Sequence, residues 1–162
     1  MERNVCGAQV HYEIIGEGTK HVVLLHGWGC DGKLMAPVAR ALADGARVLS
    51  IDFPAHGASS RPPEPWGVPE FAACVRELLM QEDFLPCAVV AHSFGGRVTL
   101  WLASEYPDMF TRIVLTGAAG IPGRPTEEGK KRAATYKRLR GLCEGVKKMK
   151  FFGSLPEKAE EA

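Results

Sequence analysis

Three short and almost wholly apolar segments constrain the fold of this chain most strongly. They cover Val22 to Leu25, Val48 to Ile51 and Ala88 to Ala91, and Ser50 is their only polar residue. Apolar runs of this length without polar alternation are typical of strands that are buried on both faces. We therefore expect a parallel sheet with helices on both sides.

Helical patterns separate these strands. Apolar residues recur at helical spacing from Leu34 to Ala43 and from Pro69 to Gln81. A further helix is expected over Gly95 to Ser104, before an apolar strand at Ile113 to Thr116. This strict alternation predicts a doubly wound α/β fold with right-handed crossovers. Functional residues are then expected at the carboxyl ends of the strands.

An additional strand is expected near the amino terminus. Val10, Tyr12 and Ile14 alternate with polar residues, which is the period of a half-exposed strand. The segment from Gly16 to Gly18 supplies a turn directly after it. We interpret this region as an edge hairpin.

Composition excludes several classes of protein. The 162 residues suit one domain, and 20 basic against 19 acidic residues give no overall charge to attract nucleic acid. No stretch approaches the roughly 20 apolar residues of a membrane span. The five cysteines are odd in number and form no Cys-x-x-Cys pair, so we expect reduced thiols, no metal, no cofactor and a cytoplasmic location.

The chain changes character at a glycine- and proline-rich junction over residues 120–125. Lysine and arginine crowd residues 130–150, where an apolar stripe still recurs at helical spacing. Because that stripe accompanies the charges, a solvated helix face is a simpler interpretation than a nucleic-acid or lipid patch.

Ser93 lies between a buried strand and a helix, in the run Val89-Val90-Ala91-His92-Ser93-Phe94-Gly95-Gly96. A sharp strand-to-helix turn forces the serine into a strained conformation. The neighbouring chain then approaches so closely that only small side chains fit two residues before and after it, here Ala91 and Gly95. This pattern predicts a nucleophile elbow with Ser93 as the nucleophile.

A second loop meets the needs of the same chemistry. His26-Gly27-Trp28-Gly29 directly follows the strand that ends at Leu25. An oxyanion hole needs two preorganised donors about 3 Å from the developing charge. We assign these donors to the backbone N–H groups of Trp28 and Phe94.

Together these segments resemble the α/β-hydrolase superfamily, in particular its cap-bearing serine hydrolases, which include esterases, carbon–carbon bond hydrolases and haloperoxidases. The resemblance also covers Tyr106-Pro107 and Asp52 to Ser59, although Ala55 and Ala91 stand where relatives more often have glycine. It implies Ser93 as nucleophile, a core over residues 1–121 and the beginning of a helical cap over residues 122–162. A serine at the elbow disfavours epoxide hydrolases and haloalkane dehalogenases, which use aspartate.

The partners of the serine are missing from this sequence. A seryl hydroxyl is a poor nucleophile until a histidine takes its proton and a carboxylate orients that histidine. In this fold both partners follow the serine, yet every histidine precedes Ser93. The histidines are His11, His21, His26, His56 and His92. We expect structural roles for His92, and hydrogen bonds within their own loops for His26 and His56.

No carboxylate follows the strand at Ile113 to Thr116 where some relatives carry the acid, and Asp52 belongs to its own loop motif. Ending after that strand would also leave it as an uncovered sheet edge. We therefore expect the chain to represent the amino-terminal part of the family pattern and to hydrolyse very little alone.

Two functional classes remain open at this stage. The first is a serine hydrolase for a small ester, thioester or related carbonyl substrate, acting through an acyl-enzyme. The alternative is a non-catalytic ligand-binding module that keeps the same pocket. A nucleotide-binding domain is disfavoured, because no Gly-x-Gly-x-x-Gly segment follows a strand.

Overall fold

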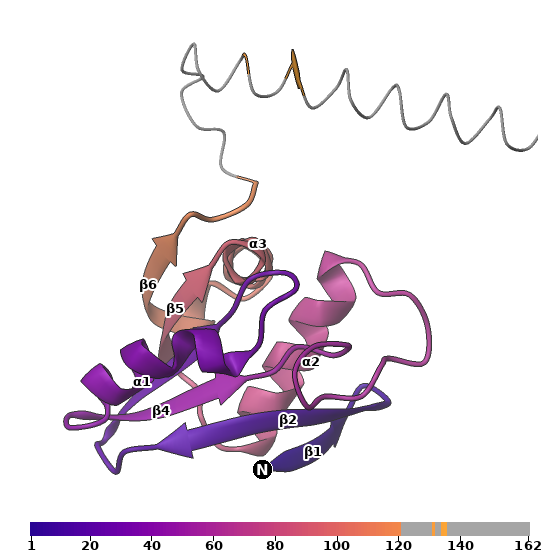
Figure 1. The fold of residues 1–162 in the computed structure, drawn as a ribbon. Coiled ribbons are helices and arrows are strands. Elements are labelled where there is room, and N and C mark those ends of the chain that lie inside the picture. The colour runs from indigo at the N-terminus through magenta and orange to yellow at the C-terminus, as the bar shows by residue number, and fades with distance from the viewer. Residues whose placement is uncertain (121–130, 132–133, 136–162) are drawn as a thin grey trace, which may run out of the picture. The chain divides into compact units, whose positions relative to one another are not determined.

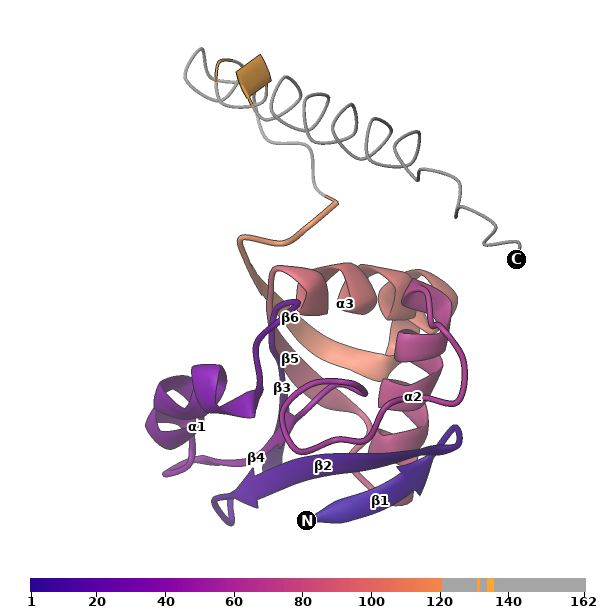
Figure 2. The same cartoon turned by 45° about the vertical axis from the view of Figure 1, so that its right-hand side comes forward.

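The computed structural model describes residues 1–120, 131, 134 and 135. Six strands form a sheet in the order β1-β2-β4-β3-β5-β6 (Figures 1 and 2). They are β1 (Glu2–Val5), β2 (Ala8–Ile15), β3 (Lys20–Leu25), β4 (Ala46–Ile51), β5 (Cys87–His92) and β6 (Phe110–Thr116). Strand β3 pairs in parallel with β4 and β5, and β5 pairs in parallel with β6. The predicted doubly wound, mostly parallel α/β sheet is confirmed.

Helices cover both faces of the sheet, as Figure 2 shows. One face carries the short 3-10 helix η1 (Gly32–Met35) and α1 (Ala36–Leu42). The other carries α2 (Val68–Gln81) and α3 (Phe94–Glu105), and the short 3-10 helix η2 (Pro107–Met109) leads into β6. The helix expected from Leu34 therefore begins as a 3-10 turn, because Pro37 lies in the first turn of α1 and has no N–H to donate to an earlier carbonyl.

The predicted edge hairpin was placed wrongly. Strand β2 alternates as expected, but it pairs antiparallel with β1 on one side and with β4 on the other. The hairpin turn lies at Cys6 and Gly7, which both have positive φ. The turn at Gly16 to Gly18 connects β2 to β3, which are not neighbours in the sheet. Strand β1 escaped prediction because three of its four residues are exposed and carry no apolar pattern.

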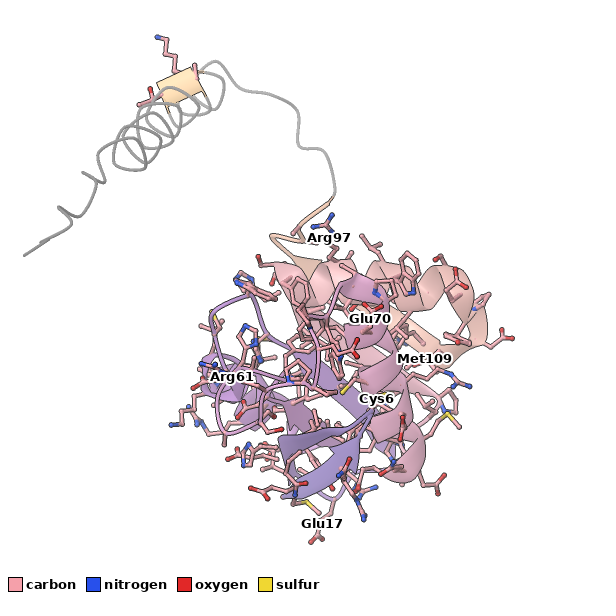
Figure 3. The ribbon with its side chains drawn as sticks, turned by 90° about the vertical axis from the view of Figure 1, so that its right-hand side faces the viewer. Cys6, Glu17, Arg61, Glu70, Arg97 and Met109 are labelled. Carbon is pink, nitrogen blue, oxygen red and sulfur yellow. The ribbon has the colours of Figure 1, made fainter. Side chains whose placement is uncertain are left out.

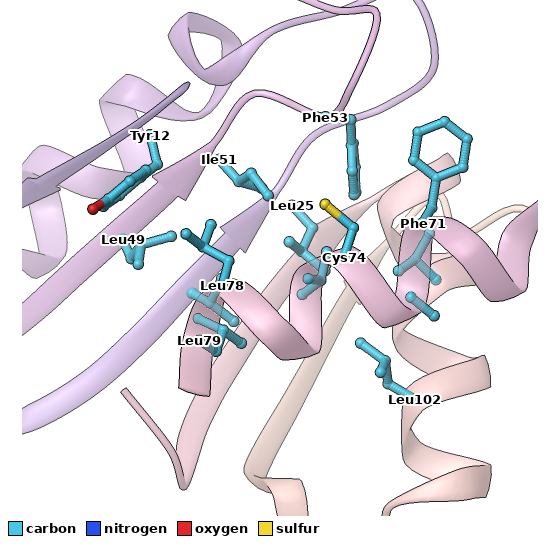
Figure 4. Close-up of a cluster of buried hydrophobic side chains, with 14 of the residues drawn as sticks. Tyr12, Leu25, Leu49, Ile51, Phe53, Phe71, Cys74, Leu78, Leu79 and Leu102 are labelled. Carbon is cyan, nitrogen blue, oxygen red and sulfur yellow. The ribbon is translucent and has the colours of Figure 1, made fainter. Parts of the chain in front are cut away.

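Apolar side chains from both sheet and helices form the main core (Figure 4). Leu25, Leu49 and Ile51 project from the central strands toward Leu78 and Leu79 of α2. A smaller cluster packs between α1 and the opposite face of β3 and β4. Two separate apolar layers therefore hold the strand ends that carry the site.

Strand β6 is the last strand of the sheet, and among the described residues it pairs with β5 alone. Ile113 and Val114 on this strand are 42% and 51% exposed. Except for residues 131, 134 and 135, the expected cap over residues 122–162, with its basic helical stripe, lies outside the described residues, so the boundary at residue 121 stays a prediction.

The cysteines that the structure describes are free thiols. Cys6 in the hairpin lies against α2, as Figure 3 shows, and its Sγ is 3.1 Å from Oε2 of Glu77. Burial and the nearby Glu77 carboxylate raise the pKa of the Cys6 thiol to about 11. In the described part of the chain, no helix has the length and apolar character needed to cross a membrane.

Helix α2 offers a direct test of the main core. We expect Leu78→Ala to lower the free energy of unfolding by about 2–5 kcal/mol, because the side chain is fully buried and its removal leaves a cavity. The matched change Met80→Ala, at an exposed position on the same helix, is expected to alter it by less than about 0.5 kcal/mol. Urea unfolding followed by circular dichroism measures both. Equal losses would contradict this packing.

Candidate active site

Ser93 occupies a strained backbone position between β5 and α3. Its φ is 49° and its ψ is −106°, a conformation that costs on the order of 1–3 kcal/mol for a residue with a side chain. Two hydrogen bonds hold it: the Ser93 N–H donates to the carbonyl of Thr116 at 3.1 Å, and the Ser93 carbonyl accepts from Ala119 at 2.9 Å. Although Ser93 precedes the first residue of α3, its hydroxyl does not cap that helix. The strand-to-helix turn expected around Ser93 is present, and the Ser93 hydroxyl is not used to cap α3.

The small residues around Ser93 have steric causes. A Cβ built on Gly95 would lie 2.5 Å from the carbonyl oxygen of Leu25, and one on Gly96 would lie 2.6 Å from Cβ of Ala118. Ala91 is completely buried two residues before the serine. Strand β3 and the chain after β6 therefore approach the start of α3 too closely for larger side chains.

The loop after β3 lies directly against the elbow. A Cβ on Gly27 would be 3.3 Å from Cβ of Ser93, and the Gly95 N–H donates to the carbonyl of His26 at 3.0 Å. The rings of Trp28 and Phe94 meet edge to face with centroids 5.1 Å apart. Ser93, Trp28 and Phe94 thus come together at the carboxyl ends of β3 and β5.

The two backbone N–H groups assigned to the oxyanion hole are not used in hydrogen bonds within the described fold. Within residues 1–120, neither the Trp28 N–H nor the Phe94 N–H takes part in a hydrogen bond. Two unpaired N–H groups beside a serine suit a ligand that carries partial negative charge. Their catalytic role stays a prediction.

His26 links the loop after β3 to the loop after β4. The ring is fully buried, its Nδ1–H donates to the Gly27 carbonyl at 2.7 Å, and Nε2 accepts from the Phe53 N–H at 3.0 Å. Burial lowers the pKa of His26, which keeps the ring neutral and fixes this pattern of one donor and one acceptor. Both ring nitrogens are therefore occupied structurally, and His26 is not free to accept a proton from Ser93.

Asp52 organises the same region from the end of β4. Oδ1 accepts from the Gly32 N–H at 2.6 Å, and Oδ2 accepts from the Ala58 N–H at 2.9 Å and lies 3.0 Å from Nδ1 of His11. Burial raises the pKa of Asp52, but the bonds from Ala58, Gly32 and His11 outweigh it and hold the pKa below its ordinary value. Sequence reasoning placed Asp52 in its loop but missed His11, whose position on an alternating strand carries no signal of a partner.

His92 and His56 are also held by main-chain oxygens. Nδ1 of His92 lies 3.1 Å from the Thr116 carbonyl and 3.2 Å from Oγ1 of Thr116. Nδ1 of His56 lies 3.0 Å from the Pro54 carbonyl, two residues away in its own loop. Thr116, which also receives the Ser93 N–H, was missed because its role lies in its carbonyl rather than its side chain. Within the described ranges, no three His, Cys, Asp or Glu side chains are grouped to hold a metal ion.

This geometry defines the class of protein. The model of the alpha/beta hydrolase fold family matches residues 20–138 of the chain. The chain belongs to the alpha/beta hydrolase family.

Known members of the family are similar over most of this chain but extend well beyond it. An uncharacterised protein of Mycobacterium tuberculosis is 31% identical over 119 residues, which are 74% of this chain and 35% of that protein. A pimeloyl-[acyl-carrier protein] methyl ester esterase of Chromobacterium violaceum is 37% identical over 108 residues, 66% of this chain and 40% of the esterase. The chain thus spans about a third to two fifths of the length of these relatives.

Solved structures give the same result. The enol-lactonase of Burkholderia xenovorans LB400 matches with a TM-score of 0.67 and 29% identity, covering 70% of this chain and 45% of the lactonase. A meta-cleavage product hydrolase of Pseudomonas fluorescens matches with a TM-score of 0.71 and 25% identity, covering 78% of this chain and 48% of that hydrolase. Both of these solved structures are hydrolases that share this core.

The contact between Gly95 and β3 can be tested by adding one methyl group. We expect Gly95→Ala to lower the free energy of unfolding by about 1–3 kcal/mol, since the new Cβ would overlap a main-chain oxygen that cannot move aside cheaply. Gly45→Ala is the matched control, because a Cβ there has no neighbour within 4 Å. Thermal unfolding of both variants measures the difference, and similar melting temperatures would count against the close approach.

Asp52 gives a prediction about pH. Because the folded protein holds the pKa of Asp52 below its ordinary value, the carboxylate stabilises the fold at neutral pH, and this stabilisation is lost as the pH falls below about 4. We expect Asp52→Asn to lower the free energy of unfolding by roughly 1–3 kcal/mol at pH 7. The difference between the two proteins should shrink on acidification, as measured by urea unfolding from pH 7 to pH 3. A difference independent of pH would show that the charge is not responsible.

Proposed function

We propose that this chain carries the nucleophile and oxyanion hole of a serine hydrolase that cleaves an ester, thioester or related carbonyl compound. The observation that carries the proposal is the backbone of Ser93, held at positive φ beside the two unpaired N–H groups of Trp28 and Phe94. Related proteins named as a methyl ester esterase and a poly(3-hydroxyalkanoate) depolymerase support an ester substrate.

The reaction would proceed in two stages. Oγ of Ser93 attacks the carbonyl carbon while a histidine accepts the hydroxyl proton, and the oxyanion that forms receives hydrogen bonds from Trp28 and Phe94. The intermediate collapses with loss of the alcohol or thiol, which takes the proton from that histidine. Water then hydrolyses the acyl-enzyme by the same sequence of steps. In this fold the histidine follows the serine in the chain, and these 162 residues hold none after Ser93.

A small neutral substrate and a cytoplasmic location complete this proposal. The balance of 20 basic and 19 acidic residues offers no general attraction to a polyanion. The free thiols at Cys6, Cys30, Cys74 and Cys87 suit a reducing compartment.

The second candidate is a ligand-binding module without catalysis, since the unpaired N–H groups of Trp28 and Phe94 would bind a ligand oxygen whether or not Ser93 reacts. It uses the same residues, but Ser93 then acts only as a hydrogen-bonding group. The two candidates differ in one measurable property, the formation of a covalent bond at Ser93.

Fluorophosphonate labelling tests this property. We expect the natural full-length gene product to be labelled at Ser93 and Ser93→Ala to remain unlabelled. The 162-residue chain alone should react more slowly by on the order of a millionfold, since removal of the histidine costs that much in serine proteases. Mass spectrometry of the labelled peptide identifies the residue. A gene product that binds esters but is not labelled would favour the binding module.

A further inference from the structure

A groove beside the oxyanion loop has no role in the chemistry described above. It has a volume of about 820 Å³ and lies between the loop after β3 and the loop after β4. Two of its walls are large apolar side chains that water reaches, Trp28 at 63% exposed and Leu34 at 49% exposed. Exposed aromatic and aliphatic groups that share one concave surface are typical of ligand sites.

The groove is linked to the elbow through Trp28. The backbone of this residue lies next to Gly27, whose position is within van der Waals reach of Ser93, while its ring contacts Phe94 on the elbow helix. The same ring meets His56 edge to face, with centroids 4.9 Å apart. Trp28 therefore connects the two places: its N–H can bind the carbonyl of a ligand, and its ring lines the groove.

His56 lines this groove and carries a hydrogen-bond acceptor. Its Nδ1 lies 3.0 Å from the Pro54 carbonyl, and because a carbonyl oxygen only accepts, Nδ1 must carry the hydrogen. In the neutral ring Nε2 then has a lone pair and no hydrogen. No described residue donates to this Nε2, so the acceptor is free for a ligand.

The charges in the groove favour a neutral ligand. Asp31 and Lys33 both line it and carry opposite charges. The Asp31 carboxylate accepts a hydrogen bond from the backbone N–H of Lys33 at 3.1 Å. Neither sign dominates, and His56 adds an uncharged polar group to the lining.

We propose that the groove binds an aryl group with a phenolic hydroxyl, carried by a neutral ester. The aryl ring packs on the indole of Trp28 and on Leu34, and the hydroxyl donates to Nε2 of His56. This inference extends the proposed function by naming a substrate class for the same site. His56 acts here as a specificity residue, and Ser93 is not needed for the binding itself.

Equilibrium binding to Ser93→Ala tests the proposal without turnover. The probes are methyl 4-hydroxyphenylacetate and methyl phenylacetate, which differ by one hydroxyl, and calorimetry measures both affinities. We expect the hydroxylated ester to bind about three- to tenfold more tightly, the factor that one neutral hydrogen bond supplies. Equal affinities would overturn the proposal.

Two further variants assign the preference to His56. In a Ser93→Ala background, His56→Phe keeps an aromatic ring beside Trp28 but removes the acceptor, so the two esters should bind alike. Leu34→Ala removes an apolar contact with the aryl ring and leaves the acceptor in place, so it should weaken the binding of both esters by the same factor. A preference that survives His56→Phe would also overturn the proposal.

The nitrogen NMR signal of His56 gives a readout in which His56 itself is not substituted. Adding the hydroxylated ester to Ser93→Ala should move the Nε2 signal, while methyl phenylacetate should leave it in place, and identical responses would contradict the assignment. Because none of these measurements requires catalysis, they remain decisive even if Ser93 is never labelled. Labelling of Ser93 together with equal affinities would reject only this inference.

Discussion

The strained turn at Ser93 is the constraint on which the rest of the structure depends. A residue with a side chain does not adopt a φ of 49° and a ψ of −106° unless its surroundings hold it there. Here the carbonyl of Thr116 and the N–H of Ala119 bind the two sides of the Ser93 peptide. Gly95 closes the turn by contact with β3, which a larger residue would prevent. The strain is therefore offset by contacts at three parallel strands, so the elbow depends on β3, β5 and β6 together.

Buried polar groups tie the surrounding loops to this turn. His26 joins the loop after β3 to Phe53, and Asp52 joins the start of η1 to the segment after β4. Among the described residues, no buried side-chain nitrogen or oxygen lacks a partner. Since an unsatisfied buried group costs about 1–3 kcal/mol, these bonds fix the loops in one arrangement. Hydrogen-bonded main chain thus shapes a site whose two donors are themselves main-chain groups.

Much of the fold follows from patterns that depend on neighbours in sequence. Each of β3, β4 and β5 shows its burial as an apolar run, and α2 shows it as helical spacing. These patterns can be recognised within one segment, so the elements were predicted within a few residues. The loop glycines and Ala91 likewise placed Ser93, Trp28 and Phe94 at one end of the sheet. What escaped prediction depends on partners far along the chain. The pairing of β1 with β2 depends on a strand with only one apolar residue. The contact of His11 with Asp52 spans 41 positions, and Thr116 acts through its carbonyl.

If the proposed function holds, the structure separates the two requirements of serine catalysis. Stabilisation of an oxyanion depends on amides whose direction is set by β3, β5 and α3, and all three elements lie within the first 105 residues. Proton transfer depends on one side chain that only has to reach Oγ of Ser93, so it can be contributed by any segment that packs at the carboxyl ends of the strands. The exposed edge at β6, with Ile113 and Val114 open to water, is where further strands of such a sheet would pair. Under the proposed function, the two N–H donors can thus be in place before the group that activates the serine, because strain and main-chain geometry hold them there.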